Sequence, residues 1–96
     1  MTLREFQQQI EQIYFDKDSA RGMEATFMWL VEEVGELSRA LRRKSPEELA
    51  GEFADCAAWL NTLASLAGLD LEQAVSDKYG HGCPKCASTP CSCGGP

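Results

Sequence analysis

The chain has 96 residues, with 9 basic against 15 acidic side chains and a formal net charge of −6. A chain of this length forms one domain at most, and so small a core often depends on a partner subunit or a metal ion. The acidic balance argues against a protein that binds nucleic acid through its phosphate backbone. No apolar run is long enough to span a membrane, and the N-terminus lacks a signal-peptide core, so we expect a cytoplasmic protein.

The first half of the chain carries apolar residues at helical spacing. This spacing predicts a first amphipathic helix over residues 2 to about 16, followed by a charged loop over residues 16–22. A long second helix should begin near Glu24 and continue into Arg42-Arg43-Lys44. Positive charge of this kind suits a helix C-terminus, so the second helix should end there.

A clear helix start follows at Ser45. Ser45 is the expected N-cap, Pro46 takes the first helical position, and Glu48 completes a capping box. The third helix should continue to Ala67, where Gly68 is placed as a C-terminal breaker.

Asp70 is the expected cap of a short fourth helix from Leu71 to about Tyr79. The sequence contains no strand-like alternation and no internal repeat of useful length. Residues 1–80 are therefore expected to form one all-α domain, with residues 81–96 as a separate tail.

Three glutamates lie close together on the second predicted helix. Glu32, Glu33 and Glu36 fall within an arc of about 100° and share one face. A separate apolar stripe consists of Phe27, Leu30, Val34, Leu37 and Leu41. The acidic face is therefore expected to border the core, with Glu33 nearest the boundary.

The third predicted helix carries a second acidic pair, Glu52 and Asp55, at i, i+3 spacing. Its apolar residues Leu49, Phe53, Leu60 and Leu63 are expected to face inward. Like charges packed at a helix interface repel one another, so a cation should compensate them. Mg²⁺ and Mn²⁺ prefer such carboxylate oxygens. The alternative is a solvated acidic face without metal.

Several segments together resemble the MazG family of nucleoside triphosphate pyrophosphohydrolases. They are Trp-Leu-Val-Glu-Glu-Val-Gly-Glu-Leu at 29–37, Glu-Phe-Ala-Asp at 52–55, and Leu-Ala-Gly-Leu-Asp-Leu-Glu-Gln-Ala-Val at 66–75. The Asp-Ser-Ala-Arg-Gly segment at 18–22 is similar to the family's approach to the first metal helix. The likeness covers most of residues 1–80, and all five acidic positions match in order.

The resemblance implies a MazG-like helical bundle that is completed by pairing of subunits, as a homodimer or a homotetramer. It also implies Mg²⁺-dependent cleavage of a nucleoside triphosphate by water into a monophosphate and pyrophosphate. Glu32, Glu36, Glu52 and Asp55 carry over as metal ligands, and Glu33 as a further ligand or as the base. Hydrolysis of (deoxy)nucleoside triphosphates for nucleotide-pool house-cleaning is the role we expect.

Five further residues are candidates for substrate contact. Trp29 and Trp59 lie rotationally among the acids of their helices and are expected either to stack on a nucleobase or to fill a core or interface. Asn61 is a candidate for binding a base edge or a sugar hydroxyl. The alternative is that it is a polar residue on an exposed helix face. Lys78 and Arg21 are candidate phosphate contacts. The alternative is that both are solvated surface charges without a role in binding.

The tail concentrates four of the five cysteines: Cys83, Cys86, Cys91 and Cys93. A Cys-x-x-Cys pair followed by a second close pair is typical of a structural Cys₄ zinc site, although the second pair is Cys-x-Cys. Disulfides or a disordered tail are the alternatives, and disulfides are disfavoured in a reducing cytoplasm. His81 either replaces one thiolate or has no role, and Cys56 is expected to be a small core residue.

Two other functions fit the same residues. One is a non-catalytic helical module that binds metal or a partner. The other is the phosphoribosyl-ATP pyrophosphohydrolase of histidine synthesis, although segments 29–37 and 66–75 look more like MazG.

Overall fold

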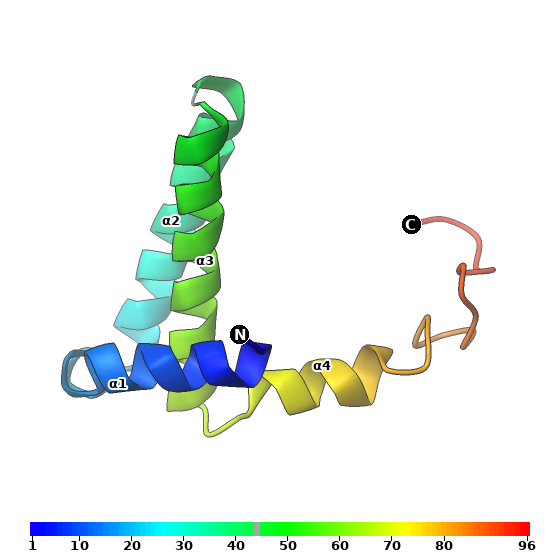
Figure 1. Cartoon of the computed structure of the whole chain (residues 1–96), viewed down its shortest axis with the longest axis horizontal. Coiled ribbons are helices and arrows are strands. Elements are labelled where there is room, and N and C mark those ends of the chain that lie inside the picture. Colours follow the sequence, from blue (N-terminus) through cyan, green and yellow to red (C-terminus); the bar gives the residue numbers. More distant parts are fainter. Residues whose placement is uncertain (44) are drawn as a thin grey trace.

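The protein is all-helical in a computed structural model that describes residues 1–43 and 45–96. The helices of this described part are α1 (Leu3–Arg21), α2 (Met23–Arg43), α3 (Pro46–Leu66) and α4 (Leu71–Tyr79), as Figure 1 shows, and it contains no strand. The all-α prediction is therefore confirmed. Lys44, expected at the C-terminus of the second helix, lies outside the described residues.

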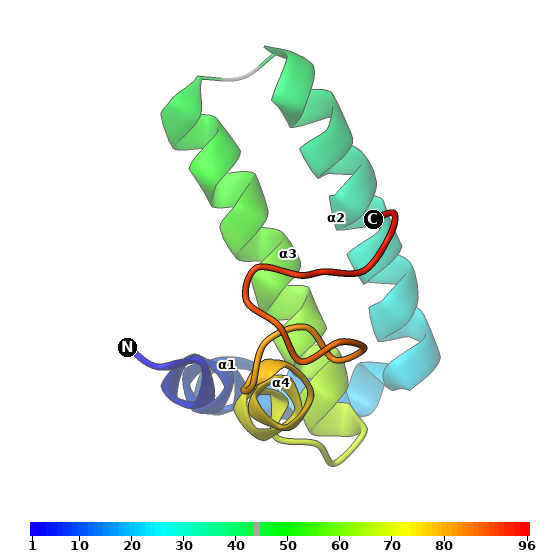
Figure 2. The same ribbon diagram turned by 90° about the vertical axis from the view of Figure 1, so that its right-hand side faces the viewer.

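α2 and α3 form an antiparallel hairpin, and α1 crosses its base (Figure 1). α4 leads away from the hairpin, and the view in Figure 2 looks along α4 toward α1. The Cα radius of gyration is 15.7 Å, whereas a compact domain of 100 residues has about 13 Å. The single chain is therefore open, with the tail held away from the hairpin (Figure 1).

α1 is longer than the apolar spacing predicts, because residues 16–21 continue the helix and do not form a loop. Nothing in that charged segment breaks a helix, and the first breaker is Gly22. Gly22 has a φ of 84°, which favours glycine, and its N–H donates to the carbonyl of Asp18 at 3.1 Å. At the other end, Thr2 and Glu5 form a capping box that the sequence reasoning missed.

The boundaries of α3 agree with the predicted start and stop signals. Ser45 is the N-cap, and its hydroxyl accepts from the backbone N–H of Glu48 at 3.4 Å. Pro46 begins the helix, which ends at Leu66, one residue before the predicted end. Gly68 follows with a φ of 75°, a conformation that glycine adopts without strain.

The start of α4 is fastened to the start of α1. Asp70 caps α4 as predicted, because its carboxylate accepts from the backbone N–H of Gln73 at 3.1 Å. The same carboxylate accepts from Arg4 Nε at 2.6 Å, and Arg4 also pairs with Glu72 at 2.9 Å. These two ion pairs join the first turn of α1 to the first turn of α4.

Gln7 of α1 holds the turn between α3 and α4 in place. Its side chain is 5% exposed, and it donates to the carbonyl of Leu69 at 2.8 Å and to Ser65 Oγ at 3.0 Å. Its amide oxygen accepts from the backbone N–H of Leu71 at 2.9 Å. The buried amide thereby satisfies backbone groups that a turn leaves unpaired.

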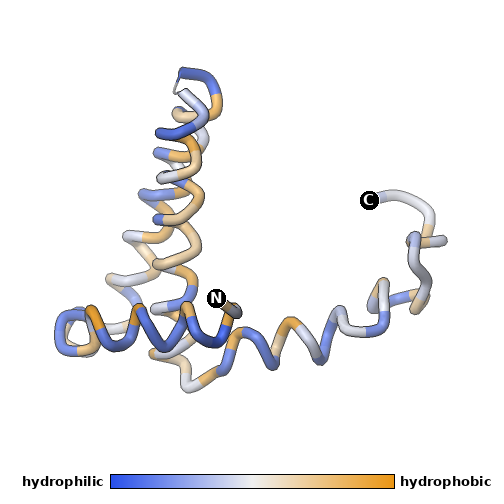
Figure 3. The backbone as a smooth tube through the Cα atoms, viewed as in Figure 1, coloured by the Kyte–Doolittle hydropathy of each residue, from blue (hydrophilic) through white to orange (hydrophobic). Residues whose placement is uncertain are grey.

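Little apolar surface is buried within one chain. Ile10 and Ala40 are the buried apolar residues of the described part, although apolar positions occur in every helix (Figure 3). Phe27, Val34 and Leu41 of the stripe on α2 are 51–61% exposed in the single chain, a surface that the expected pairing of subunits would cover. Phe53 and Leu60 on α3, expected to face inward, are also about half exposed in the single chain.

We call this hairpin inverted, because three of its carboxylates, Glu33, Glu52 and Asp55, converge between the two helices while much of its apolar surface is exposed. Apolar spacing identifies the stripe but gives no information on whether the same chain or another covers it. No helix in the described residues is long and apolar enough to cross a membrane.

Candidate functional site

Three carboxylates converge between the two helices of the hairpin. Glu33 of α2 and Glu52 and Asp55 of α3 each offer an oxygen, and these oxygens all lie within 4.8 Å of one another. Glu52 is only 9% exposed, Glu33 is half-buried and Asp55 is exposed. The i, i+3 spacing on α3 places its two acids on one side, opposite the acidic face of α2.

The charges in this cluster act on one another. The pKa of Glu33 is raised above its usual value, first by burial and then by the neighbouring charges of Asp55, Glu36, Glu52 and Glu32. Burial also raises the pKa of the Cys56 thiol, helped by the three carboxylates. The group is hence a strongly negative, partly desolvated pocket of hard oxygen donors, which is the donor set that Mg²⁺ and Mn²⁺ prefer.

The other two predicted ligands lie farther round α2. Glu36 is half-buried and close enough to raise the pKa of Glu33, but it is not part of the converging group. Glu32 is exposed and lines shallow hollows with Phe27, Met28 and Arg39. The structure therefore brings together three of the five predicted acids, with Glu36 beside them and Glu32 turned outward.

Two tryptophans meet next to the carboxylates. The rings of Trp29 and Trp59 are nearly parallel, with an angle of 14° between their planes and 6.0 Å between their centroids. The guanidinium of Arg21 lies 4.8 Å from the centroid of Trp59 and pairs with Asp18 at 2.9 Å. This arrangement offers aromatic faces and a cation side by side.

A pocket beside these groups includes Trp59, Arg21 and one of the three carboxylates, Asp55. It is lined by Ile10, Tyr14, Lys17, Asp18, Arg21, Asp55, Ala58, Trp59 and Thr62. Within it, Thr62 Oγ1 donates to Asp18 Oδ2 at 3.3 Å, so Asp18 links α1 to α3. Sequence reasoning missed two lining residues for different reasons. Lys17 fell in the segment expected to be a loop, and Tyr14 fell in the predicted first helix, whose packing against α3 the sequence did not show.

Two substrate candidates lie elsewhere. Asn61 is 1% exposed and its amide donates to the carbonyl of Ala57 at 2.7 Å, so the alternative of an exposed helix face is wrong. Lys78 is exposed on α4, where its ammonium lies 5.7 Å from the centroid of the Tyr79 ring. Neither residue lines the pocket beside the carboxylates.

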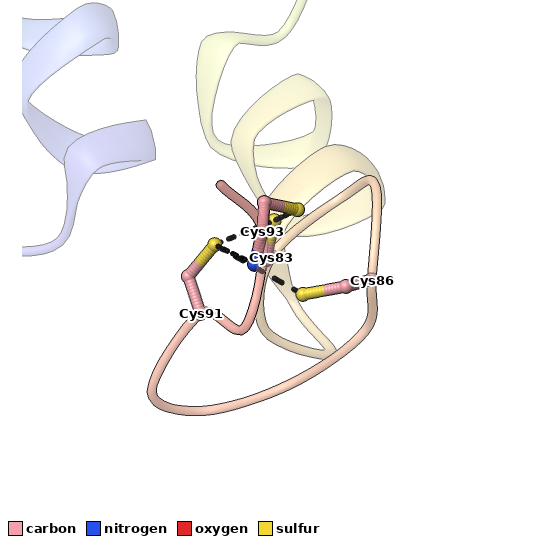
Figure 4. Close-up of side chains that lie close together, drawn as sticks. All are labelled: Cys83, Cys86, Cys91 and Cys93. Atoms are coloured by element: carbon pink, nitrogen blue, oxygen red, sulfur yellow. Dashed lines mark hydrogen bonds between the residues drawn. The ribbon is translucent and has the colours of Figure 1, made fainter. Parts of the chain in front are cut away.

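The four tail cysteines form a second cluster, drawn in Figure 4. Their sulfur atoms all lie within 4.8 Å of one another, and His81 is not part of the group. All five cysteines of the chain, Cys56 included, are free thiols. Hydrogen bonds from the side chain and backbone of Ser92, and from the backbone of Ser88, lower the pKa of the Cys86 thiol to about 5.

Comparison with known proteins identifies the family. The family model for the MazG nucleotide pyrophosphohydrolase domain matches residues 21–87, so this chain belongs to the MazG nucleotide pyrophosphohydrolase family. The match extends over α2, α3 and α4 into the tail. No curated protein matches the chain.

Proposed function

We propose that this protein hydrolyses (deoxy)nucleoside triphosphates to nucleoside monophosphate and pyrophosphate in the presence of Mg²⁺. The observation that carries the proposal is the convergence of Glu33, Glu52 and Asp55 within 4.8 Å in a chain of the MazG family. Convergence from two helices requires a specific register of α2 against α3, whereas a merely solvated acidic face does not.

The converging acids fit a hard divalent cation. Glu33, Glu52 and Asp55 would hold Mg²⁺ or Mn²⁺, with Glu36 adjacent and Glu32 retained from the family pattern as the ligand with least geometric support. When bound, the metal neutralises charge on the triphosphate and makes water more acidic. Glu33, beside the other two carboxylates, is the proposed further ligand or the base that accepts a proton from the attacking water.

The side chains around the carboxylates supply groups for binding the nucleotide. The Trp29 and Trp59 rings offer flat faces for a nucleobase, and base stacking on aromatic rings contributes about 1–3 kcal/mol. Arg21 and Lys17 line the pocket beside Asp55 and supply positive charge for phosphate oxygens. Lys78 is proposed as a phosphate contact on the strength of the family resemblance alone, and Asn61 as a contact to a base edge or sugar hydroxyl because of its amide group.

A second copy of the chain is the proposed partner, in a homodimer or a homotetramer. The support is the exposed apolar stripe of α2, with Phe27, Val34 and Leu41 at heptad spacing. The cellular role we propose is house-cleaning of the nucleotide pool in the cytoplasm.

The decisive experiment is a pyrophosphate-release assay with Mg²⁺ and a panel of canonical and damaged nucleotides, with phosphoribosyl-ATP included. We expect Asp55→Asn and Glu36→Gln to lower turnover by about 100-fold or more while leaving the helical circular dichroism unchanged, because each removes a charge near the metal. The matched control is Asp77→Asn on α4, which removes an exposed aspartate remote from the carboxylates and should keep wild-type turnover.

Each outcome distinguishes one of the alternatives. If the wild type hydrolysed none of the nucleotides, the protein would be the non-catalytic helical module that binds metal or a partner. Preferred turnover of phosphoribosyl-ATP would assign the histidine-synthesis reaction. Full activity of Asp55→Asn would mean that the carboxylate assignment is wrong.

A further inference from the structure

The tail beyond α4 contains a cluster of sulfur atoms that the pyrophosphohydrolase chemistry does not use. Cys91 Sγ lies 3.6 Å from Cys83 Sγ and 4.0 Å from Cys86 Sγ, and Cys83 Sγ lies 3.9 Å from Cys93 Sγ. The four sulfurs are thus linked in one continuous group (Figure 4).

The spacing of the sulfurs matches the corners of a metal-centred tetrahedron. A Zn–S bond of about 2.3 Å in tetrahedral geometry places each pair of sulfurs about 3.8 Å apart. The three distances above fall on either side of that value, and the other three of the six sulfur–sulfur separations stay within 4.8 Å. Two disulfides would instead require two pairs, each at about 2.05 Å.

The backbone around the sulfurs is folded to present them inward. The N–H of Ala87 donates to the carbonyl of Cys83 at 2.7 Å, and the N–H of Cys83 donates to the carbonyl of Ser88 at 3.2 Å. Ala87, directly after Cys86, has a φ of 58°, a left-handed conformation that ends the turn containing the first two cysteines. Cys83 and Cys86 consequently point toward the same centre (Figure 4).

Gly82 makes this turn sterically feasible. Its φ is 103°, and a Cβ at this position would lie 2.8 Å from Thr89 Oγ1 and 3.1 Å from the carbonyl oxygen of Ser88. Any other residue would therefore push apart the two halves of the tail that carry the cysteines. Gly94, by contrast, has open space around its Cβ position and no positive φ.

Backbone N–H groups also point at the sulfurs. The N–H of Ser92 donates to Cys86 Sγ at 3.4 Å, and the N–H of Cys93 donates to Cys91 Sγ at 3.3 Å. Such donors stabilise negative charge on sulfur, and metal-bound thiolates carry that charge.

We propose that Cys83, Cys86, Cys91 and Cys93 bind one structural Zn²⁺ ion and that this ion holds the tail in its fold. Each thiol loses its proton to solvent on binding, so the zinc is held by four thiolates. Neither α4 nor the tail contains a buried residue, so apolar packing supplies little stability there. The two sites should bind different metals, because soft sulfur donors prefer Zn²⁺ whereas the hard carboxylate oxygens on the hairpin prefer Mg²⁺ or Mn²⁺.

The direct test is the metal content of the purified full-length protein. Loosely bound metal is first removed with EDTA, and the EDTA is then removed by gel filtration. Elemental analysis should then give about one zinc per chain. Cobalt in place of zinc should give the visible bands of a tetrahedral site and thiolate-to-cobalt charge transfer. Cys86→Ser and Cys91→Ser should lose the bound zinc, whereas Cys56→Ser, outside the cluster, should retain it.

A second pair of variants tests the geometry without removing a ligand. Gly82→Ala should weaken zinc binding by about 10- to 100-fold, as loss of a supporting shell does, whereas Gly94→Ala should leave it unchanged. Circular dichroism should remain helical in all of these variants, because the tail lies outside α1 to α4.

Three results would overturn the proposal. They are four free thiols with no stoichiometric metal, two disulfides detected by mass spectrometry of the non-reduced protein, and iron or an iron–sulfur chromophore in place of zinc. Because zinc content is read without any nucleotide, none of these results bears on the pyrophosphohydrolase proposal.

Discussion

Glu33 is under electrostatic strain when no cation is bound. Its carboxylate is half-buried beside Glu52 and Asp55, and burial together with these charges raises its pKa. Folding therefore favours the protonated form of Glu33. As the pH rises above the unfolded value near 4.5, its contribution to the stability of the metal-free protein falls.

Neutralising this residue should therefore stabilise the metal-free protein. We expect Glu33→Gln to raise the thermal midpoint by a few degrees in EDTA at neutral pH, since about 1 kcal/mol corresponds to 4–8 °C in a domain of this size. Mg²⁺ should raise the midpoint of the wild type and have much less effect on the variant. Thermal circular dichroism with and without Mg²⁺ measures both shifts, and a lower midpoint of the metal-free variant would contradict the expectation.

At the scale of elements, α4 depends on the ion pairs of Arg4. A hydrogen bond from the Arg4 guanidinium is the main reason that the pKa of Asp70 lies below its usual value of 3.8. A lowered carboxyl pKa stabilises the fold above the unfolded value, and this stabilisation is lost as the pH falls through the folded value.

Arg4→Gln should consequently be less stable than the wild type at about pH 6, with the difference shrinking toward about pH 2 as Asp70 becomes protonated in both proteins. Arg42→Gln, which removes an equal charge from an exposed position at the end of α2, is the control. Thermal midpoints across this pH range provide the measurement. A difference that stays constant with pH would mean that Asp70 is not the acid involved.

Capping residues in the sequence correctly predicted where α3 and α4 begin. The capping hydrogen bonds of Ser45 and Asp70 each reach only three residues along the chain, and Pro46 suits a first helical position, so α3 and α4 begin where expected. The end of α1 was placed too early because a charged segment was interpreted as a loop. Gly22, with its positive φ, was the signal that should have been used.

Contacts between helices required the structure. Helical spacing put Glu33 near the core boundary, but the convergence with Glu52 and Asp55 depends on the register of α2 against α3. The same register turns Glu32 outward, although the family pattern includes it. Whether the apolar stripe is covered by the same chain depends on the packing of the whole molecule, which helical periodicity does not describe.

At the scale of the whole molecule, the apolar stripe of α2 should mediate assembly. We expect Leu41→Lys to shift the proposed oligomer toward monomer, because it places a charge on a side chain that is 61% exposed in one chain and that the proposed assembly would cover. Val75→Lys, at an exposed apolar position on α4, is the control. Light scattering after gel filtration gives the mass, and a wild-type monomer would contradict the proposal.

The inverted hairpin makes α2 intolerant of changes in length. Glu33 faces the acids of α3 while Phe27, Val34 and Leu41 are exposed, so the direction of each side chain is set by its angle around the helix axis. One residue inserted just after Glu33 would rotate the remainder of the helix by about 100°. Glu36, Leu37 and Leu41 would all change direction, whereas Glu33 would keep its place. An insertion or deletion in α2 should therefore be far more damaging than a substitution, unless its length restores the helical phase.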